Sequence, residues 1–277
     1  MTEKTDEVKE FYQGYHDRIF AKRYNSPFWL RRYTHRQIHA QILAYVKPGQ
    51  RVLDVGCGEG ILSCLAAQKG ATVIGTDISG DNIRGAKDLA KSWAVKVDFL
   101  QTDAESLPFN DDSIDLVISS HVLEHLPDLF GGLNELHRVT GGMALIAMPT
   151  CLNPSCWALL GGDNFWKLTR RSPIAVPFGL LRTLFALVRG DEGPDEGYGG
   201  NTDVPHIWRF PWVMRRQIES VGFNISKFES GPLTIPYLAN YIPFLRRLQP
   251  MIDSLRGRPI LRQLGYGSLA ICNKNRS

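Results

Sequence analysis

The sequence lacks the features that mark membrane-spanning, secreted and disulfide-stapled proteins. No stretch of about eighteen uncharged apolar residues occurs, so we expect no membrane span. The first ten residues are highly charged and contain no apolar segment, so we expect no secretion signal. The five cysteines include no C-x-x-C pair, and their odd number favours reduced thiols. These absences together predict a cytoplasmic protein.

A strong charge of one sign is also missing. The net charge of +4 is too small to imply nucleic acid by itself, and no RNA-binding or helix-turn-helix signature occurs, so we expect no nucleic-acid partner. With 277 residues and 43% hydrophobic content, the chain can build a large core and is not disordered. One domain with additions and two domains both fit this length.

A glycine-rich turn follows the first apolar strand pattern. Its three glycines stand at every second position, at Gly56, Gly58 and Gly60. Glycine lets the backbone come close to a small ligand. Asp54 lies two residues before the first glycine, and Asp77, nineteen residues after Gly58, closes the next strand pattern, where an acidic residue can read a ribose. The pattern predicts a nucleoside pocket at the carboxyl edge of a parallel sheet.

The spacing of the glycines separates two cofactors that share this architecture. The dinucleotide fingerprint G-x-G-x-x-G needs a third glycine where this chain has Ile61. A nicotinamide-dependent (NAD) oxidoreductase is therefore the alternative hypothesis and not the main one. A third hypothesis is a non-catalytic cofactor-binding subunit that serves as a partner's scaffold.

Four segments, in order, resemble the motifs of class I (Rossmann-like) S-adenosylmethionine-dependent methyltransferases, in the type 11 group that includes quinone-biosynthesis enzymes. The segments are residues 53–60, 75–79, 101–109 and 113–128. The resemblance covers about residues 45 to 150 and implies S-adenosylmethionine as cofactor. It also implies an α/β fold, with a doubly wound, seven-stranded, mainly parallel sheet whose last strand is antiparallel, plus helical lid insertions.

The resemblance implies roles for the motif residues. Asp54 and the glycine loop would hold the methionyl end of the cofactor. Asp77 would accept hydrogen bonds from both ribose hydroxyls, and Asp103 would contact the adenine. Each aspartate alone would equally suit a solvated turn or a helix cap, but their order and spacing favour the site. The expected cofactor-binding residues are Asp54, Gly56, Gly58, Gly60, Asp77, Ile78, Asp103, Ala104, Ser120 and His121.

Methyl transfer from a sulfonium mainly requires that a nucleophile be aligned with the methyl group and that water be excluded. A hydroxyl acceptor would also use a base. His121, just beyond the fourth strand pattern, and His206, at the end of the first insertion, are the expected catalytic residues. We expect His125 to serve the cofactor side or the start of a helix. No metal site is indicated, because His, Asp and Glu do not recur at ligand spacing.

Strand and helix patterns alternate along the chain, as a doubly wound sheet requires. If the strands before the two insertions are parallel, both insertions emerge at the carboxyl edge and can cover the site. Acceptor choice should then reside in the insertions and the N-terminal segment. The expected parts are an N-terminal helical cap (1–45), the cofactor-binding half (46–150), a lid insertion (151–210), and a C-terminal part (211–277) with a second insertion (232–262).

The insertions combine apolar stretches with arginines. Residues 165–189 contain five basic residues and no acidic one, and Asp253 is the only acid in residues 232–262. This pattern is typical of a helix in the membrane interface, and equally of a lid packed on the catalytic domain. We therefore expect methylation of an oxygen or carbon of a hydrophobic small molecule, lipid-linked molecule or glycan. The protein would be cytoplasmic or peripheral on anionic lipid at the inner membrane face.

Overall fold

The computed structural model describes residues 25–195 and 206–274. The expected N-terminal cap is thus described from residue 25 onward, and its aromatic residues before that point lie outside the described part. The glycine-rich run that follows Arg189 is described as far as Asp195.

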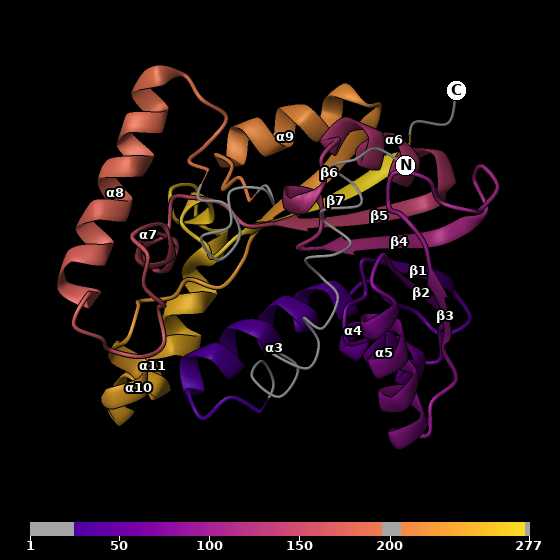
Figure 1. Ribbon diagram of the computed structural model, residues 1–277, viewed down its shortest axis with the longest axis horizontal. Coiled ribbons are helices and arrows are strands. Elements are labelled where there is room, and N and C mark those ends of the chain that lie inside the picture. Colours follow the sequence, from indigo (N-terminus) through magenta and orange to yellow (C-terminus); the bar gives the residue numbers. More distant parts are fainter. Residues whose placement is uncertain (1–24, 196–205, 275–277) are drawn as a thin grey trace.

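Seven strands form one sheet in the order β3-β2-β1-β4-β5-β7-β6 (Figure 1). Strands β1 to β5 are parallel, and β7 lies antiparallel between β5 and β6. The predicted doubly wound α/β fold with an antiparallel last strand is confirmed. The strands are β1 (Arg51–Val55), β2 (Thr72–Asp77), β3 (Asp98–Gln101), β4 (Ile114–Ser120), β5 (Thr140–Met148), β6 (Phe223–Ser230) and β7 (Ser268–Lys274).

Helices cover both faces of the sheet, namely α3 (Trp29–Leu43), α4 (Ile61–Gln68), α5 (Gly80–Ser92), α6 (Leu129–Val139) and α9 (Pro211–Ser220). Successive strand side chains point to opposite faces, so neighbouring residues enter different cores. Leu53 and Val117 pack in the core that includes α6 and α9. Val52 and Leu116 pack in the core that includes α3 and α4. Because both faces are covered, these strands carry buried apolar residues on both faces.

Both insertions leave the sheet at the same edge. Ser268 of β7 pairs with Met148 at the end of β5 and with Ser230 at the end of β6. Strands β5 and β6 therefore point the same way, and the segments after them gather beside α3 (Figure 1). We call these helical segments the lid. It comprises α7 (Pro154–Leu160), α8 (Ser172–Arg189), α10 (Leu238–Tyr241), α11 (Pro243–Ser254) and the 3-10 turns η3 (Leu255–Gly257) and η4 (Leu261–Gln263).

The lid has small cores of its own. Trp208 and Phe210 are buried with residues of α7 and α8, and Phe165 and Tyr237 are buried with Leu30 of α3. Helices α7 and α8 approach so closely that a Cβ atom on Gly179 would lie 1.9 Å from the backbone oxygen of Trp157. These contacts fix the lid to the edge of the sheet and to α3.

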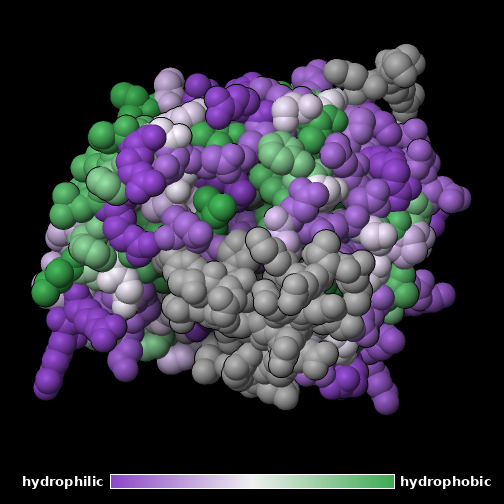
Figure 2. Space-filling view, turned by 45° about the horizontal axis from the view of Figure 1, so that its top comes forward, coloured by the Kyte–Doolittle hydropathy of each residue, from purple (hydrophilic) through white to green (hydrophobic). Residues whose placement is uncertain are grey.

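The outer face of α8 is apolar and exposed. Its inner face, which includes Ala175, Gly179 and Thr183, is buried. Among the described residues, α8 alone is long and apolar enough to cross a membrane, by length and composition only. Apolar side chains gather at the left edge of Figure 2, the side on which α8 lies in Figure 1. The exposed apolar residues of α8 are Ile174, Phe178, Leu181, Leu184, Phe185, Leu187 and Val188.

Candidate functional site

A cavity of about 980 Å³ lies between the carboxyl ends of the strands and the lid. Its wall is formed by the loop after β1, the ends of β2 and β4, the 3-10 turn η2 (Leu123–His125), α3 and residues of the lid. A volume of this size is at the upper end of the usual range for small-molecule sites. Cofactor and acceptor can therefore occupy it side by side.

The three glycines after β1 have left-handed backbones but different surroundings. A Cβ atom on Gly56 would lie 2.2 Å from a methyl group of Val122, and one on Gly60 would lie 2.7 Å from the Cβ atom of Ala86. A Cβ atom on Gly58 would meet no described atom within 4 Å. Gly56 and Gly58 line the cavity, whereas Gly60 does not. Gly60 thus allows α4 and α5 to pack, and Gly58 presents its backbone to a ligand.

The buried carboxylate of Asp77 joins the glycine loop to the end of β2. Its Oδ2 atom accepts a hydrogen bond of 2.9 Å from the Gly58 amide, and its Oδ1 atom accepts bonds from the Ser79 amide at 2.9 Å and the Asn82 side chain at 3.1 Å. Burial raises the pKa of Asp77, while these hydrogen bonds act against the rise. A carboxylate accepts about four hydrogen bonds, so capacity remains for a ribose hydroxyl.

Asp54 lies buried at the end of β1 and accepts a hydrogen bond of 2.5 Å from the Ser63 hydroxyl. Burial raises the pKa of Asp54 to about 7; the Ser63 bond opposes this effect and the nearby Asp77 adds to it. A cationic ligand group at the loop would favour the ionised form of Asp54, because an opposite charge lowers a carboxyl pKa.

The remaining expected cofactor-binding residues line the same cavity. Asp103 follows β3 and accepts a hydrogen bond of 2.9 Å from the Glu105 amide, which fixes its side chain at the rim. With the exception of Gly60, the structure thus brings the whole expected set together. The residues that complete it are Ile78, Ala104, Ser120 and His121.

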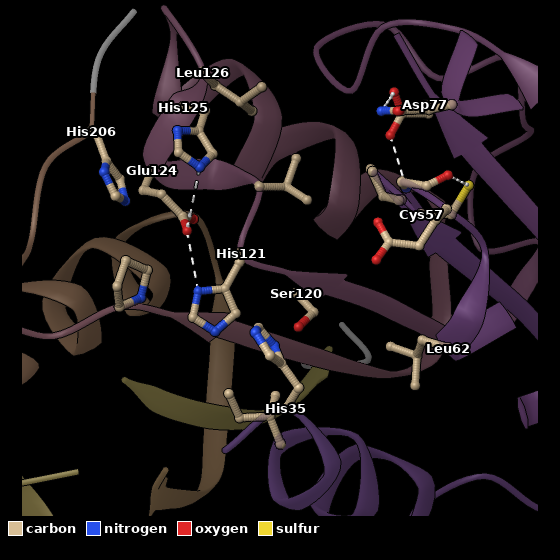
Figure 3. Close-up of a pocket in the computed structure, with 18 of the residues that line it drawn as sticks. His35, Cys57, Leu62, Asp77, Ser120, His121, Glu124, His125, Leu126 and His206 are labelled. Carbon is tan, nitrogen blue, oxygen red and sulfur yellow. Dashed lines mark hydrogen bonds and ion pairs between the residues drawn. The ribbon is translucent and has the colours of Figure 1, made fainter. Parts of the chain in front are cut away.

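A group of histidines surrounds the carboxylate of Glu124 on the other side of the cavity (Figure 3). The Nδ1 atom of His121 lies 3.3 Å from Oε1 of Glu124, and the Nε2 atom of His125 lies 3.8 Å from it. Burial alone would raise the pKa of Glu124, but the His121 hydrogen bond and the charges of His125 and His206 lower it to about 2. Glu124 therefore holds a negative charge inside the cavity wall.

Different elements bring these side chains together. His121 has a left-handed backbone with φ of 58°, which is uncommon outside glycine, and its amide donates to the Ala147 carbonyl at 2.9 Å. His206 lies between α8 and α9 in the sequence. The next residue, Ile207, forms an isolated β-bridge with Asp195. The rings of His125 and His206 stack with centroids 4.7 Å apart. Glu124 is not among the site residues expected from the sequence, although its position between His121 and His125 is a usable signal.

The part of the cavity beyond this cluster is basic and aromatic. Arg31 of α3 lies over the Trp166 ring, 4.4 Å from its centroid, and the Arg182 guanidinium donates to the Leu160 carbonyl at 2.8 Å. Rings and cations on one wall suit a flat acceptor with an electron-rich face. The aromatic and basic lining residues here are Arg31, His35, His39, Phe165, Trp166, Arg171, Arg182, Trp208 and Tyr266.

Residues 53–146 match a family model described as a methyltransferase domain. The seven-stranded sheet and the strand-end cavity agree with that match. Residues 53–146 thus form a methyltransferase domain, and the sheet around it has the class I, Rossmann-like fold.

Two kinds of curated relative resemble the chain. A ubiquinone biosynthesis O-methyltransferase of Rhizobium etli is 43% identical over 143 residues, which is 47% of this chain and 58% of that enzyme. An uncharacterized protein of Mycobacterium tuberculosis is 37% identical over 110 residues, which is 39% of this chain and 40% of that protein. The matches thus span about half the length of these relatives.

Solved structures share the fold over nearly the whole chain. Magnesium protoporphyrin IX methyltransferase of Synechocystis, with bound S-adenosylmethionine, has a TM-score of 0.60 at 16% identity and covers 99% of both chains. The [4+2]-cyclase SpnF has a TM-score of 0.62 at 16% identity, over 98% of this chain and 96% of its own. The fold therefore does not by itself define the reaction.

The glycine loop gives a matched pair of substitutions. Gly60→Ala should destabilise the protein by about 2–4 kcal/mol, because its Cβ atom would overlap Ala86 in a strained backbone. Gly58→Ala should cost only about 1 kcal/mol, from backbone strain, but should weaken binding of S-adenosylmethionine. Denaturant unfolding and calorimetry measure the two effects. Equal stability losses in the two variants would contradict this division of roles.

Proposed function

We propose that the protein transfers the methyl group of S-adenosylmethionine to an oxygen of a hydrophobic acceptor. The observation that supports this most directly is the single cavity that joins the Asp77 and Gly58 loops to the pair of His121 and Glu124. The loops suit an adenosine and a zwitterionic tail, and the pair suits an acceptor that must lose a proton.

In this reaction His121 is the base. Glu124 holds the Nδ1 side of the His121 ring, which leaves Nε2 to take the proton of an acceptor hydroxyl. As that proton moves to Nε2, the acceptor oxygen forms a bond to the methyl carbon. The bond between methyl and sulfur breaks, and S-adenosylhomocysteine leaves. His206 lines the same cavity and is the second candidate for the base.

Two rival functions are less well supported. The fingerprint of a nicotinamide-dependent oxidoreductase requires a glycine at the start of α4, where this chain has Ile61. The family model that matches is a methyltransferase domain. Another reaction on the same fold is supported by the cyclase of related fold, which gives no support to a non-catalytic subunit. The buried Glu124 argues against a non-catalytic subunit. Burying a charged side chain costs folding free energy, and such groups cluster at functional sites.

A lipid or lipid-linked acceptor is supported by the outer face of the lid. Besides the apolar residues of α8, the lid exposes apolar side chains on α10 and α11, where Tyr241, Phe244 and Met251 are at least half exposed. Exposed Lys167, Arg170 and Arg189 flank α8 at its two ends. Apolar surface rimmed by cations fits an anionic membrane interface. On this account the protein is cytoplasmic and peripheral to the membrane.

Transfer of labelled methyl from S-adenosylmethionine into lipid, glycan and small-molecule fractions of a cell extract tests the function. We expect label in a hydrophobic, alkali-stable methyl ether product, and a loss of rate of about 10²–10⁴-fold in His121→Ala. His137→Ala is the matched control, because His137 packs against Phe223 away from the cavity. Binding of the cofactor without turnover on any fraction would overturn the proposal in favour of a scaffold subunit.

Flotation on anionic vesicles at low salt tests the membrane face. The wild-type chain should float, and Phe178→Ser with Phe185→Ser should abolish flotation, because two exposed rings of α8 are lost. Phe130→Ser removes a ring on α6 that is 45% exposed, and this variant should float like wild type. A wild-type protein that stays with the soluble fraction would remove the interfacial role of the lid.

A further inference from the structure

We propose that Glu124, His125 and His206 form a binding site for a divalent transition metal ion, open toward the acceptor side of the cavity. Metal binding itself is independent of methyl transfer. Its consequence for the acceptor, given below, rests on the proposed function.

The three side chains already lie at near-ligand distances. One carboxylate oxygen and one imidazole nitrogen from each histidine all lie within 4.8 Å of one another. Ligand atoms about 2.0–2.2 Å from a zinc ion are about 3.5 Å apart in a tetrahedral site. The Nε2 atom of His125 is 3.8 Å from the carboxylate of Glu124, so small side-chain rotations would complete the site.

An independent observation is the second oxygen of Glu124. Oε1 faces His121, whereas Oε2 is buried and has no hydrogen-bond partner among the described residues. The Glu124 side chain is only 1% exposed. A buried carboxylate oxygen without a partner costs free energy that a bound cation would recover.

The donor set indicates the kind of metal. Two imidazoles with one carboxylate suit zinc, manganese, iron or cobalt, whereas magnesium prefers oxygen ligands and water. Three protein ligands leave at least one position open, as in catalytic sites. His121 then sits beside the metal and is oriented by the same carboxylate. The metal would also connect η2, which carries His125, to the segment between α8 and α9, which carries His206.

The proposed metal site restricts the methyl acceptor to molecules with an oxygen that can bind the metal. An oxygen acceptor in the open position, such as a phenol or vicinal diol, would lose its proton more readily beside the cation. The proton passes to His121 or to water, the oxygen forms its bond to the methyl carbon, and the bond between methyl and sulfur breaks. A carbon acceptor without such an oxygen gains nothing from this arrangement. The sequence indicates no metal site because His206 is remote from Glu124 along the chain.

Cobalt uptake by the full-length, untagged, chelator-treated protein tests the site. We expect one equivalent of Co²⁺ with visible absorption bands of a low-symmetry site, and competition by Zn²⁺. Glu124→Gln and His206→Ala should each weaken uptake at least about tenfold. His39→Ala is the matched control, because His39 lines the same cavity outside the cluster and should bind cobalt like wild type.

Absence of stoichiometric uptake in the wild type would overturn the inference. So would unchanged uptake in both ligand variants, and circular dichroism with S-adenosylmethionine titration identifies a variant that has failed to fold. Cobalt bound through Glu124 and His206 in a protein without methyl transfer would leave the metal site standing and refute the proposed function. Methyl transfer by a wild-type protein that takes up no cobalt would refute the metal site and leave the proposed function standing.

Discussion

The hydrogen bond from the Gly58 amide to the buried carboxylate of Asp77 is the contact on which the cofactor side depends. It brings the loop after β1 against the end of β2, and Ser79 and Asn82 hold the same carboxylate from the other side. The open space at Gly58 and the close packing at Gly60 follow from that loop path. A charged side chain can stay buried here because donors surround it.

The opposite wall depends on the direction of two strands. Since Ser268 pairs with Met148 and with Ser230, β5 and β6 end at one edge, and the lid grows from both. His206, which lies between α8 and α9 in the sequence, stacks on the ring of His125. This side of the cavity is therefore formed by residues that are distant in sequence. The outer face of the lid is apolar and exposed, whereas the side that lines the cavity is basic and aromatic.

The sheet and most of the cofactor side were predictable, because apolar strand patterns and glycine spacing are local signals. The bounds of a short strand are less predictable, because they depend on pairing: β3 begins at Asp98, since only residues from Asp98 onward pair with β2. The packing role of Gly60 depends on Ala86 of another helix, which spacing cannot reveal. The cluster around Glu124 needs His206, whose position only the folded lid determines.

If the proposed function is correct, this cavity binds S-adenosylmethionine through the loops joined by Asp77. Calorimetric titration of the purified protein with S-adenosylmethionine and, separately, with NADH tests it most directly. We expect one S-adenosylmethionine site per chain, no comparable NADH binding, and sharply weaker S-adenosylmethionine binding in Asp77→Ala, which loses the loop contact and the ribose acceptor together. Tight NADH binding without S-adenosylmethionine binding would contradict it.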